Sequence, residues 1–405
     1  MKRWMDIVLM GALAVASAVA AAAPPAPVAR VRVAFDRQGV TDTRAEGLAD
    51  VAAGRALGAD DPVRIASISK LVLAIGVLRL VEQGRLRLDD DASVLLGRPL
   101  RNPAFPARPI TLRMLLSHTS SLTDGAGYWN VPLGEASTLI TDQAAAWDRQ
   151  HAPGRFFRYS NLNFPLVAEI MERAGGERFD RLMQRLVFAP MRIDACHNWS
   201  GCSDAAIARA VVLYDAAGQP QKDDLHGRRP PCLVIPGRDR SCDIAGRWQP
   251  GRNGALFSPQ GGVRISANGL ARIGRMLLNG GRLDGVRILR PRSVRALLTP
   301  VWIFDGRNGA IIEEDEPDRG GFFCAYGLAT QHLAYGDGRT CRDDPFGDGR
   351  RRVGHSGNAY GLLSGLWIDP RAGTGVAYFA TGVPNDSSGK RSAFSAVEEA
   401  GATGW

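Results

Sequence analysis

Residues 66–80 read ASISKLVLAIGVLRL, a stretch that places Ser67 three positions before Lys70 at the start of an apolar run. The chain has four lysines among its 50 lysine and arginine residues, so a lysine at this position stands out. Apolar residues continue at helical spacing until Gly84 and predict a helix. Because residues three apart share one face of a helix, the two side chains can meet.

The pairing of Ser67 with Lys70 is one that nucleophilic catalysis can use. A serine hydroxyl becomes a nucleophile when a base takes its proton, and an amine is such a base only while it is neutral. Burial lowers the pKa of a lysine, whereas an arginine keeps its proton. A helix N-terminus also favours developing negative charge near the Ser67 N–H. The structural alternative is a lysine whose stem lies along an amphipathic helix, and a lone Ser-x-x-Lys match is weak.

Two later stretches make the interpretation more specific. YSN occupies residues 159–161 in PGRFFRYSNLN, and HSG occupies residues 355–357 in RRVGHSGNAYG. With SISK in this order, they resemble the serine β-lactamase and penicillin-binding protein superfamily. Within it, the chain is similar to the class C branch, which includes class C β-lactamases, D-alanyl-D-alanine carboxypeptidases, D-aminopeptidases and esterases. The resemblance covers residues 52–382.

The resemblance implies roles for individual residues. Ser67 would be the nucleophile that forms an acyl-enzyme, and Lys70 would take or relay its proton. Tyr159 would act as general acid/base toward the leaving group. Asn161 would hold Lys70 and the substrate amide by hydrogen bonds. The N–H groups of Ser67 and Asn358 would form the oxyanion hole.

His355, Ser356 and Gly357 would form the opposite wall of the cleft and contact the substrate, with Gly357 leaving room for close approach. Class C β-lactamases usually have Lys-Thr-Gly here, and a histidine is a less reliable cation for the carboxylate of a β-lactam. The motif therefore favours a peptidase or esterase. His118 could be read as a serine–histidine base, but in this family its stretch shapes a helix end. Ser121 stands where the family commonly has glycine.

The pattern of elements predicts an α/β (α+β) fold of the β-lactamase/transpeptidase type. Strands are expected over residues 28–35 and 47–54, and a hairpin over residues 362–381. Helical patterns lie between them, so we expect an antiparallel sheet built from both termini and flanked by helices, with an inserted mainly helical domain. The expected sheet domain covers residues 23–85 and 255–400. The expected helical domain, residues 86–254, ends in a Cys-rich region without a clear period.

The first 22 residues follow the pattern of a secretory signal peptide, with an uncleaved anchor as the alternative. In an oxidising compartment the six cysteines are expected to form disulfides, and we predict the local pairs 196–202, 232–242 and 324–341. A zinc site using Cys196, His197, Cys202 and His226 is the alternative, although the spacing does not recommend it.

The sequence therefore predicts an exported, periplasmic or secreted, serine hydrolase that acts through Ser67 on a D-amino-acid peptide, a short ester or a β-lactam. No metal or cofactor is expected to be required, and no membrane span in the mature form. The expected partner is a small-molecule or peptide substrate, with peptidoglycan-derived compounds among the candidates. The charge of +9 is spread along the chain and does not favour a nucleic-acid partner. A non-hydrolysing penicillin- or peptidoglycan-binding sensor, and a structural envelope protein with an inactive hydrolase fold, remain alternatives.

Overall fold

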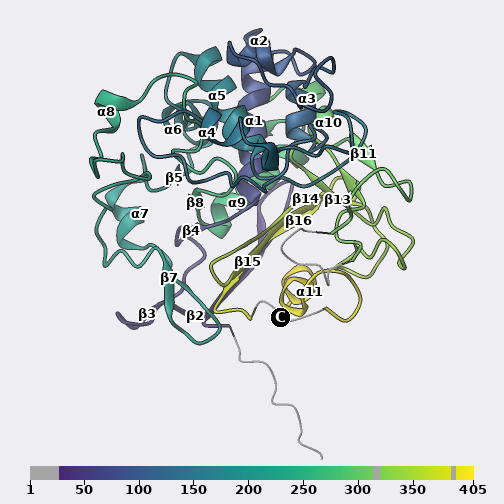
Figure 1. The fold of residues 1–405 in the computed structure, drawn as a ribbon. Coiled ribbons are helices and arrows are strands. Elements are labelled where there is room, and N and C mark those ends of the chain that lie inside the picture. The colour runs from purple at the N-terminus through teal and green to yellow at the C-terminus, as the bar shows by residue number, and fades with distance from the viewer. Residues whose placement is uncertain (1–26, 313–319, 385–388) are drawn as a thin grey trace, which may run out of the picture.

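One antiparallel sheet takes strands from both ends of the chain (Figure 1). The computed structural model describes residues 27–312, 320–384 and 389–405, so the predicted signal peptide lies outside the described residues. β1 pairs with β16 along its whole length, which confirms the sheet predicted from the two termini. The nine strands follow the spatial order β11 (Trp302–Ile303), β12 (Ala325–Tyr326), β13 (Gln331–Leu333), β14 (Arg352–Ala359), β15 (Leu362–Asp369), β16 (Thr374–Thr381), β1 (Ala29–Asp36), β2 (Val40–Asp50) and β3 (Arg55–Ala56).

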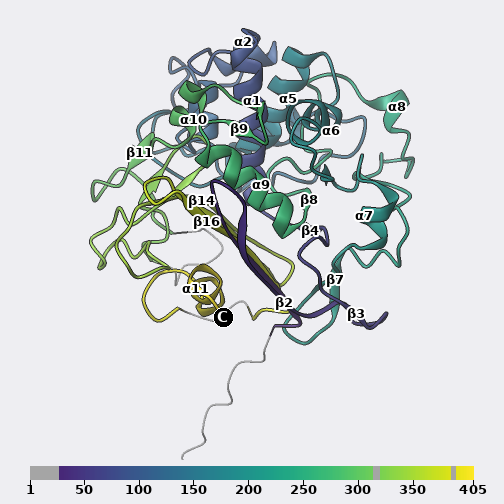
Figure 2. The same ribbon diagram turned by 180° about the vertical axis from the view of Figure 1, so that it is seen from behind.

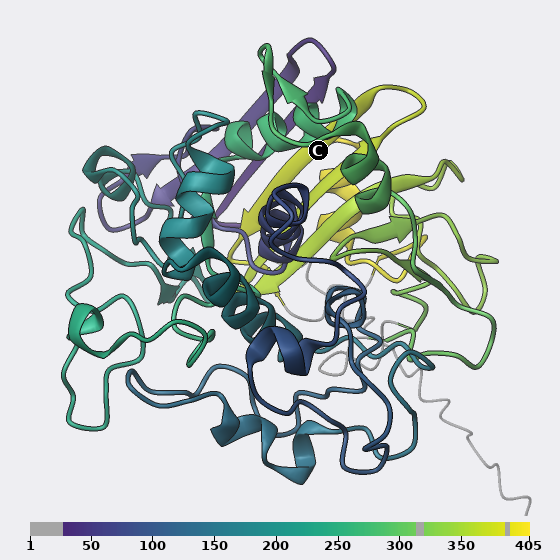
Figure 3. The same ribbon diagram turned by 90° about the horizontal axis from the view of Figure 1, so that it is seen from above.

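The two faces of the sheet are covered by different helices. Successive side chains of a strand point to opposite faces, and in β16 Phe379 joins the main core with α1 (Ile68–Glu82) and α9 (Ala267–Leu278). Tyr378 packs on the other face, against α11 (Ala396–Thr403). Figure 2 shows α9 crossing its face of the sheet, and Figure 3 shows α1 nearly end on beside the strands. The sheet therefore has helices on both faces.

The other helices are short and lie mostly in the middle of the chain. They are α2 (Ala92–Leu96), α3 (Leu112–Leu116), α4 (Thr138–Thr141), α5 (Asn163–Gly175), α6 (Phe179–Met183), α7 (Asp204–Ala208), α8 (Ile244–Arg247) and α10 (Pro291–Leu297), with a 3-10 turn at Ala144–Ala146 and a π-helical turn at Gln184–Phe188. α1 contacts α5 on one side and β14 on the other. The division into a sheet domain and a helical domain at residues 86 and 254 stays a prediction.

Short strands complete the architecture. β4 (Val63–Arg64), β8 (Val263–Ile265) and β5 (Cys196–His197) form a small sheet directly before α1. Two further pairs are β6 (Leu213–Tyr214) with β7 (Pro220–Lys222), and β9 (Arg282–Leu283) with β10 (Val286–Arg287). The small sheet fixes the entry of the chain into α1.

The sequence misplaced one strand and missed several short elements. The strand predicted over residues 47–54 is wrong in position, because β2 covers Val40–Asp50. Its first eight residues are exposed, so they lack the alternation that reveals a strand. The region 196–254, predicted to be irregular, contains β5, β6, β7, α7 and α8. These elements are too short to produce a hydrophobic period.

The three predicted cysteine pairs are confirmed, since the structure joins Cys196 to Cys202, Cys232 to Cys242 and Cys324 to Cys341. The zinc alternative required Cys196 and Cys202 as separate thiolates, and a disulfide removes both ligands. Across the described ranges, no helix is both long and apolar enough to cross a membrane.

The contact between α9 and the sheet gives a test of the fold. A Cβ at Gly274 of α9 would lie 2.2 Å from the Phe35 ring, which is enclosed in the core. We expect Gly274→Val to lower the free energy of unfolding by about 2 to 3 kcal/mol. Gly39→Ala, where no atom lies within 4 Å of the added Cβ, should change it by less than about 0.5 kcal/mol. Urea denaturation measures both, and equal effects would contradict this packing.

Candidate active site

Ser67 lies at the tip of a sharp turn between β4 and α1. Ala66, directly before it, has a φ of 47°, a left-handed conformation that costs a non-glycine residue about 1 to 3 kcal/mol. Ser67 occupies the N-cap position of α1, but its side chain does not cap the helix. The hydroxyl is therefore left for another partner.

That partner is Lys70, one turn along α1. Its side chain is fully buried, and its Nζ lies 2.8 Å from the Ser67 Oγ. Nζ also contacts the Asn161 Oδ1 at 2.8 Å and the backbone oxygen of Gln260 at 3.2 Å. The structure thus brings together Ser67, Lys70 and Asn161, although Asn161 lies 91 positions after Lys70 in the sequence.

Asn161 is held by a carboxylate to which the sequence analysis gave no role. Asp124 accepts hydrogen bonds from the Ser160 hydroxyl, from the backbone N–H and side-chain amide of Asn161, and from the Leu162 N–H, at 2.8 to 2.9 Å. Because the Asn161 amide nitrogen donates to Asp124, its oxygen faces Lys70. Nothing in the sequence around Asp124 distinguishes it from a surface aspartate, so only the fold reveals this contact.

Tyr159 lies on the same loop, with its ring between two other rings. The His118 ring stacks on it at a centroid distance of 4.4 Å, and the Phe323 ring at 4.8 Å. The Lys70 Nζ is 4.8 Å from the centre of the Tyr159 ring. Stacking on both faces leaves the ring little freedom to turn, so the position of the phenol next to Lys70 is fixed.

A chain of hydrogen bonds links this loop to β14. The Ser160 N–H donates to the His118 Nδ1 at 3.0 Å, so a neutral His118 carries its proton on Nε2 and donates to the Tyr326 hydroxyl at 3.2 Å. Tyr326 then donates to the His355 Nε2 at 2.8 Å, and the His355 Nδ1 donates to the Ser356 carbonyl at 2.5 Å. A backbone group at each end fixes the direction of every bond.

The two histidines of this hydrogen-bond chain, His118 and His355, are neutral. Burial lowers the pKa of His355 to about 3 and places the pKa of His118 well below its ordinary value. His355 is 1% exposed, with both ring nitrogens bonded. It therefore supplies no cation to the cleft at neutral pH. The structural role expected for His118 agrees with its contacts to the loop and to Tyr326.

The rest of the HSG motif lies against the start of α1. A Cβ at Gly357 would come within 2.5 Å of the Ile65 carbonyl and 3.1 Å of the Ser67 nitrogen, so only glycine fits without a shift. The Ser356 hydroxyl donates to the Gln331 side chain at 3.1 Å. Asn358 is exposed. β14 therefore runs past the Ser67 N–H at close range.

Ser67 opens onto two cavities. A narrow pocket contains Tyr159, His355 and the rings of Phe322 and Phe323. A separate cleft of about 1540 Å³ is lined by Arg64 and Tyr360 and not by Tyr159. Ser67 and Asn358 line both cavities.

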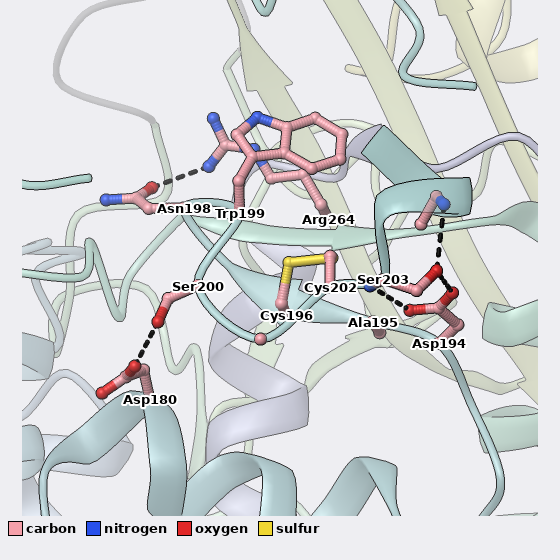
Figure 4. The surroundings of a disulfide bond; sticks show 12 residues. Asp180, Asp194, Ala195, Cys196, Asn198, Trp199, Ser200, Cys202, Ser203 and Arg264 are labelled. Carbon is pink, nitrogen blue, oxygen red and sulfur yellow. Dashed lines mark hydrogen bonds between the residues drawn. A yellow bond between two sulfur atoms is a disulfide. The ribbon is translucent and has the colours of Figure 1, made fainter. Parts of the chain in front are cut away.

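Two regions that are distant from Ser67 in sequence line these cavities. The Cys-rich region contributes much of the wall of the large cleft, including Trp199, and the 304–341 region contributes Phe322 and Phe323 to the narrow pocket. Trp199 lies on the loop that the Cys196–Cys202 disulfide closes, and Figure 4 shows it beside Arg264 of β8. The Arg264 guanidinium lies 5.5 Å from the centre of the Trp199 ring. The acidic stretch at residues 313–318 lies outside the described residues.

This fold is the one that the proteins of the β-lactamase family share. A sequence model of the Beta-lactamase family matches residues 19–400, so the chain belongs to this family. Esterase EstB of Burkholderia gladioli is 32% identical over 199 residues, which are 44% of this chain and 47% of the esterase. The D-alanyl-D-alanine-carboxypeptidase/endopeptidase AmpH of Escherichia coli K12 is 31% identical over 136 residues, 33% of this chain and 35% of AmpH. The chain thus spans less than half the length of these relatives.

Solved structures show the same fold. The octameric penicillin-binding protein homologue from Pyrococcus abyssi aligns with a TM-score of 0.62 and 19% identity, over 88% of this chain and 71% of that one. The D-amino acid amidase of Ochrobactrum anthropi SV3 aligns with a TM-score of 0.58 and 20% identity, over 87% and 86%. The predicted superfamily and fold class are therefore confirmed.

The hydrogen-bond chain gives a prediction about stability. Tyr326→Phe removes the hydroxyl between His118 and His355 and leaves a buried donor and a buried acceptor without a partner. We expect the free energy of unfolding to fall by about 2 to 4 kcal/mol in urea denaturation. Tyr335→Phe is the matched control, because the Tyr335 hydroxyl makes no hydrogen bond to the described residues. If both variants lost the same stability, the chain would not hold the loop to β14.

Proposed function

We propose that this protein is an exported serine hydrolase in which Ser67 attacks the carbonyl carbon of an amide or ester and forms an acyl-enzyme. The observation that carries the proposal is the contact of 2.8 Å between the Ser67 Oγ and the amine of the fully buried Lys70. Export is supported by the three disulfides, which persist in oxidising compartments.

The partners of Lys70 suit a neutral amine. A neutral amine has two N–H donors and one lone pair. The Asn161 Oδ1 and the Gln260 carbonyl can only accept, so they take the two donors. In the structure the Lys70 Nζ donates to the Ser67 Oγ. Once Lys70 has lost this proton, its lone pair faces the Ser67 hydroxyl, which then donates to it. In this proposal Lys70 is the general base that removes the Ser67 proton.

The reaction would run in two halves. The Ser67 Oγ forms a bond to the carbonyl carbon as its proton passes to Lys70, and the N–H groups of Ser67 and Asn358 stabilise the resulting oxyanion. Tyr159 then delivers a proton to the leaving nitrogen or oxygen as its bond to carbon breaks. Water attacks the carbonyl carbon of the acyl-enzyme in the second half, and Tyr159 accepts its proton. The bond between this carbon and the Ser67 Oγ then breaks, Lys70 returns its proton to the Ser67 oxygen, and the acid product leaves.

The remaining residues would position these groups. Asn161 orients Lys70 and binds the substrate amide, and the missing side chain of Gly357 lets the substrate backbone approach. We assign His355 and Ser356, both expected to contact the substrate, to holding β14 in place, because their polar atoms are bonded within the protein. A neutral His355 suits the carboxylate of a β-lactam poorly, so esters and D-amino-acid amides or peptides are the proposed substrates. The names of the relatives EstB and AmpH, an esterase and a carboxypeptidase, support this choice.

The nucleophile is tested by mass spectrometry of the purified protein. With a chromogenic short-chain ester, the wild type should gain an acyl adduct on Ser67, lose it again and release product. A fluorescent penicillin is the probe for the alternative, a sensor that keeps its label. Ser67→Ala should give neither adduct nor product, because no hydroxyl is left to attack. Wild-type turnover by Ser67→Ala would remove Ser67 as the nucleophile. A persistent adduct without product on the wild type would indicate the penicillin-binding sensor instead.

The base is tested by Lys70→Arg. A guanidinium keeps its proton, so acylation should slow by about 100- to 10,000-fold in stopped-flow measurements of ester cleavage. Lys390→Arg is the control, since it makes the same change at an exposed lysine and should leave the acylation rate within about twofold. Acylation by Lys70→Arg at the wild-type rate would show that Lys70 is not the base.

A further inference from the structure

A buried cation, Arg64, lies beside Ser67 in the large cleft, which Tyr159 does not line. Arg64 belongs to β4, three residues before Ser67, and only 8% of its surface is exposed. Its side chain lines the large cleft together with Ser67 and Tyr360. The two residues therefore face the same space.

The guanidinium of Arg64 has no acidic partner. It makes no hydrogen bond or ion pair to any residue in the described ranges, and its buried Nε has no acceptor there. Its close contact is with the Tyr360 ring, at 5.1 Å from the ring centre. The two terminal nitrogens of this guanidinium, Nη1 and Nη2, are thus available to a molecule in the cleft.

Arg264, the strand neighbour of Arg64, differs from it because each of its guanidinium nitrogens donates a hydrogen bond. Arg264 lies opposite Arg64 in the β4–β8 pair. It donates to both carboxylate oxygens of Asp223, at 2.8 and 3.1 Å, to the Asn198 side chain at 2.7 Å and to the Gly262 carbonyl at 2.9 Å. Asp223 therefore bonds to Arg264, and it acts on Arg64 only through its charge.

The charge of Asp223 is shared between Arg64 and Arg264, so one carboxylate faces two guanidinium groups. Burial and the positive charge of Arg264 lower the pKa of Arg64 to about 10, which still keeps it protonated at neutral pH. Two other carboxylates line the cleft, but Asp215 accepts hydrogen bonds from its own turn and Asp224 lies 3.5 Å from His226. A buried cation without a counter-ion of its own is costly, and an entering anion that pairs with it recovers part of that cost.

We propose that Arg64 binds a carboxylate carried by the acyl part of the substrate. The assignment to the acyl part rests on the proposed function, in which Tyr159 protonates the leaving group. The leaving group then lies toward the narrow pocket, and the acyl group extends into the large cleft past Arg64 and Tyr360. The guanidinium fork matches a carboxylate in two parallel hydrogen bonds. The carboxylate only binds there and stays ionised, because the reaction takes place at Ser67.

The test compares 4-nitrophenyl hydrogen adipate with 4-nitrophenyl hexanoate, whose acyl chains have equal length and end in a carboxylate or a methyl group. The measured quantity is the ratio of kcat/KM for the anionic to the neutral ester, which cancels any loss of folded enzyme. We expect this ratio to fall by about 10- to 100-fold in Arg64→Gln. Arg64→Lys should keep more of the ratio, because it retains the charge.

Lys222→Gln is the matched control. Lys222 is an exposed cation 5.6 Å from the same Tyr360 ring, and its replacement should change the ratio by less than about threefold. A ratio unchanged within twofold in Arg64→Gln would overturn the proposal. An equal fall of the ratio in Lys222→Gln would overturn the proposal as well. It would indicate that the general positive field of the cleft, and not hydrogen bonds from Arg64, selects the anionic ester.

A binding measurement separates this proposal from the proposed function. Titration calorimetry of monomethyl adipate into Ser67→Ala needs no catalysis. We expect binding that weakens at least tenfold when Arg64→Gln is added. If the wild type hydrolyses neither ester but this pattern holds, the hydrolase assignment fails and the carboxylate site stands. If monomethyl adipate does not bind to Ser67→Ala, or binds equally to the double variant, the carboxylate site fails.

Discussion

The site depends on one buried amine. The Lys70 Nζ is removed from water and held by oxygen atoms from three parts of the chain: Ser67 in its own helix, Asn161 on the loop before α5, and Gln260 before β8. Taking an amine out of water is costly unless each of its hydrogen-bonding positions is used. These three segments must therefore come together for the fold to tolerate Lys70.

Further hydrogen bonds position the residues around Lys70. Asp124 fixes the orientation of Asn161, and the chain from His118 through Tyr326 to His355 joins the same loop to β14. Neutral histidines suit this arrangement, because a protonated ring could not accept from the Ser160 N–H or from Tyr326. The loop that carries Tyr159 and the strand that passes Ser67 are thus positioned by one continuous set of hydrogen bonds.

The sequence reveals the parts of this site that local patterns encode. The start of α1 combines an apolar run with a Ser-x-x-Lys motif, so the meeting of Ser67 with Lys70 could be predicted. The fold class followed from the pattern of strands and helices and from the resemblance carried by three motifs in order. The local cysteine pairs were one choice among fifteen possible connectivities, and the structure contains these three pairs. β2 could not be placed because its exposed residues carry no alternation. Asp124 and Tyr326 could not be assigned because their importance comes from partners distant in sequence, with no signal of their own.

The distribution of charge across the cleft depends on the HSG motif at residues 355–357 and on Arg64, and it bears on which substrates bind. Where the related β-lactamases usually have a lysine, this chain has His355, which is buried and neutral, so the end of the cleft near Tyr159 has no cation at that position. Arg64, which lines the large cleft with Ser67, is a buried cation without an ion pair to any described residue. Because the strength of a charge pair falls with distance and rises with burial, an anionic group on a substrate is favoured on the Arg64 side of Ser67. The position of a single arginine thus determines which end of the substrate can carry the charge.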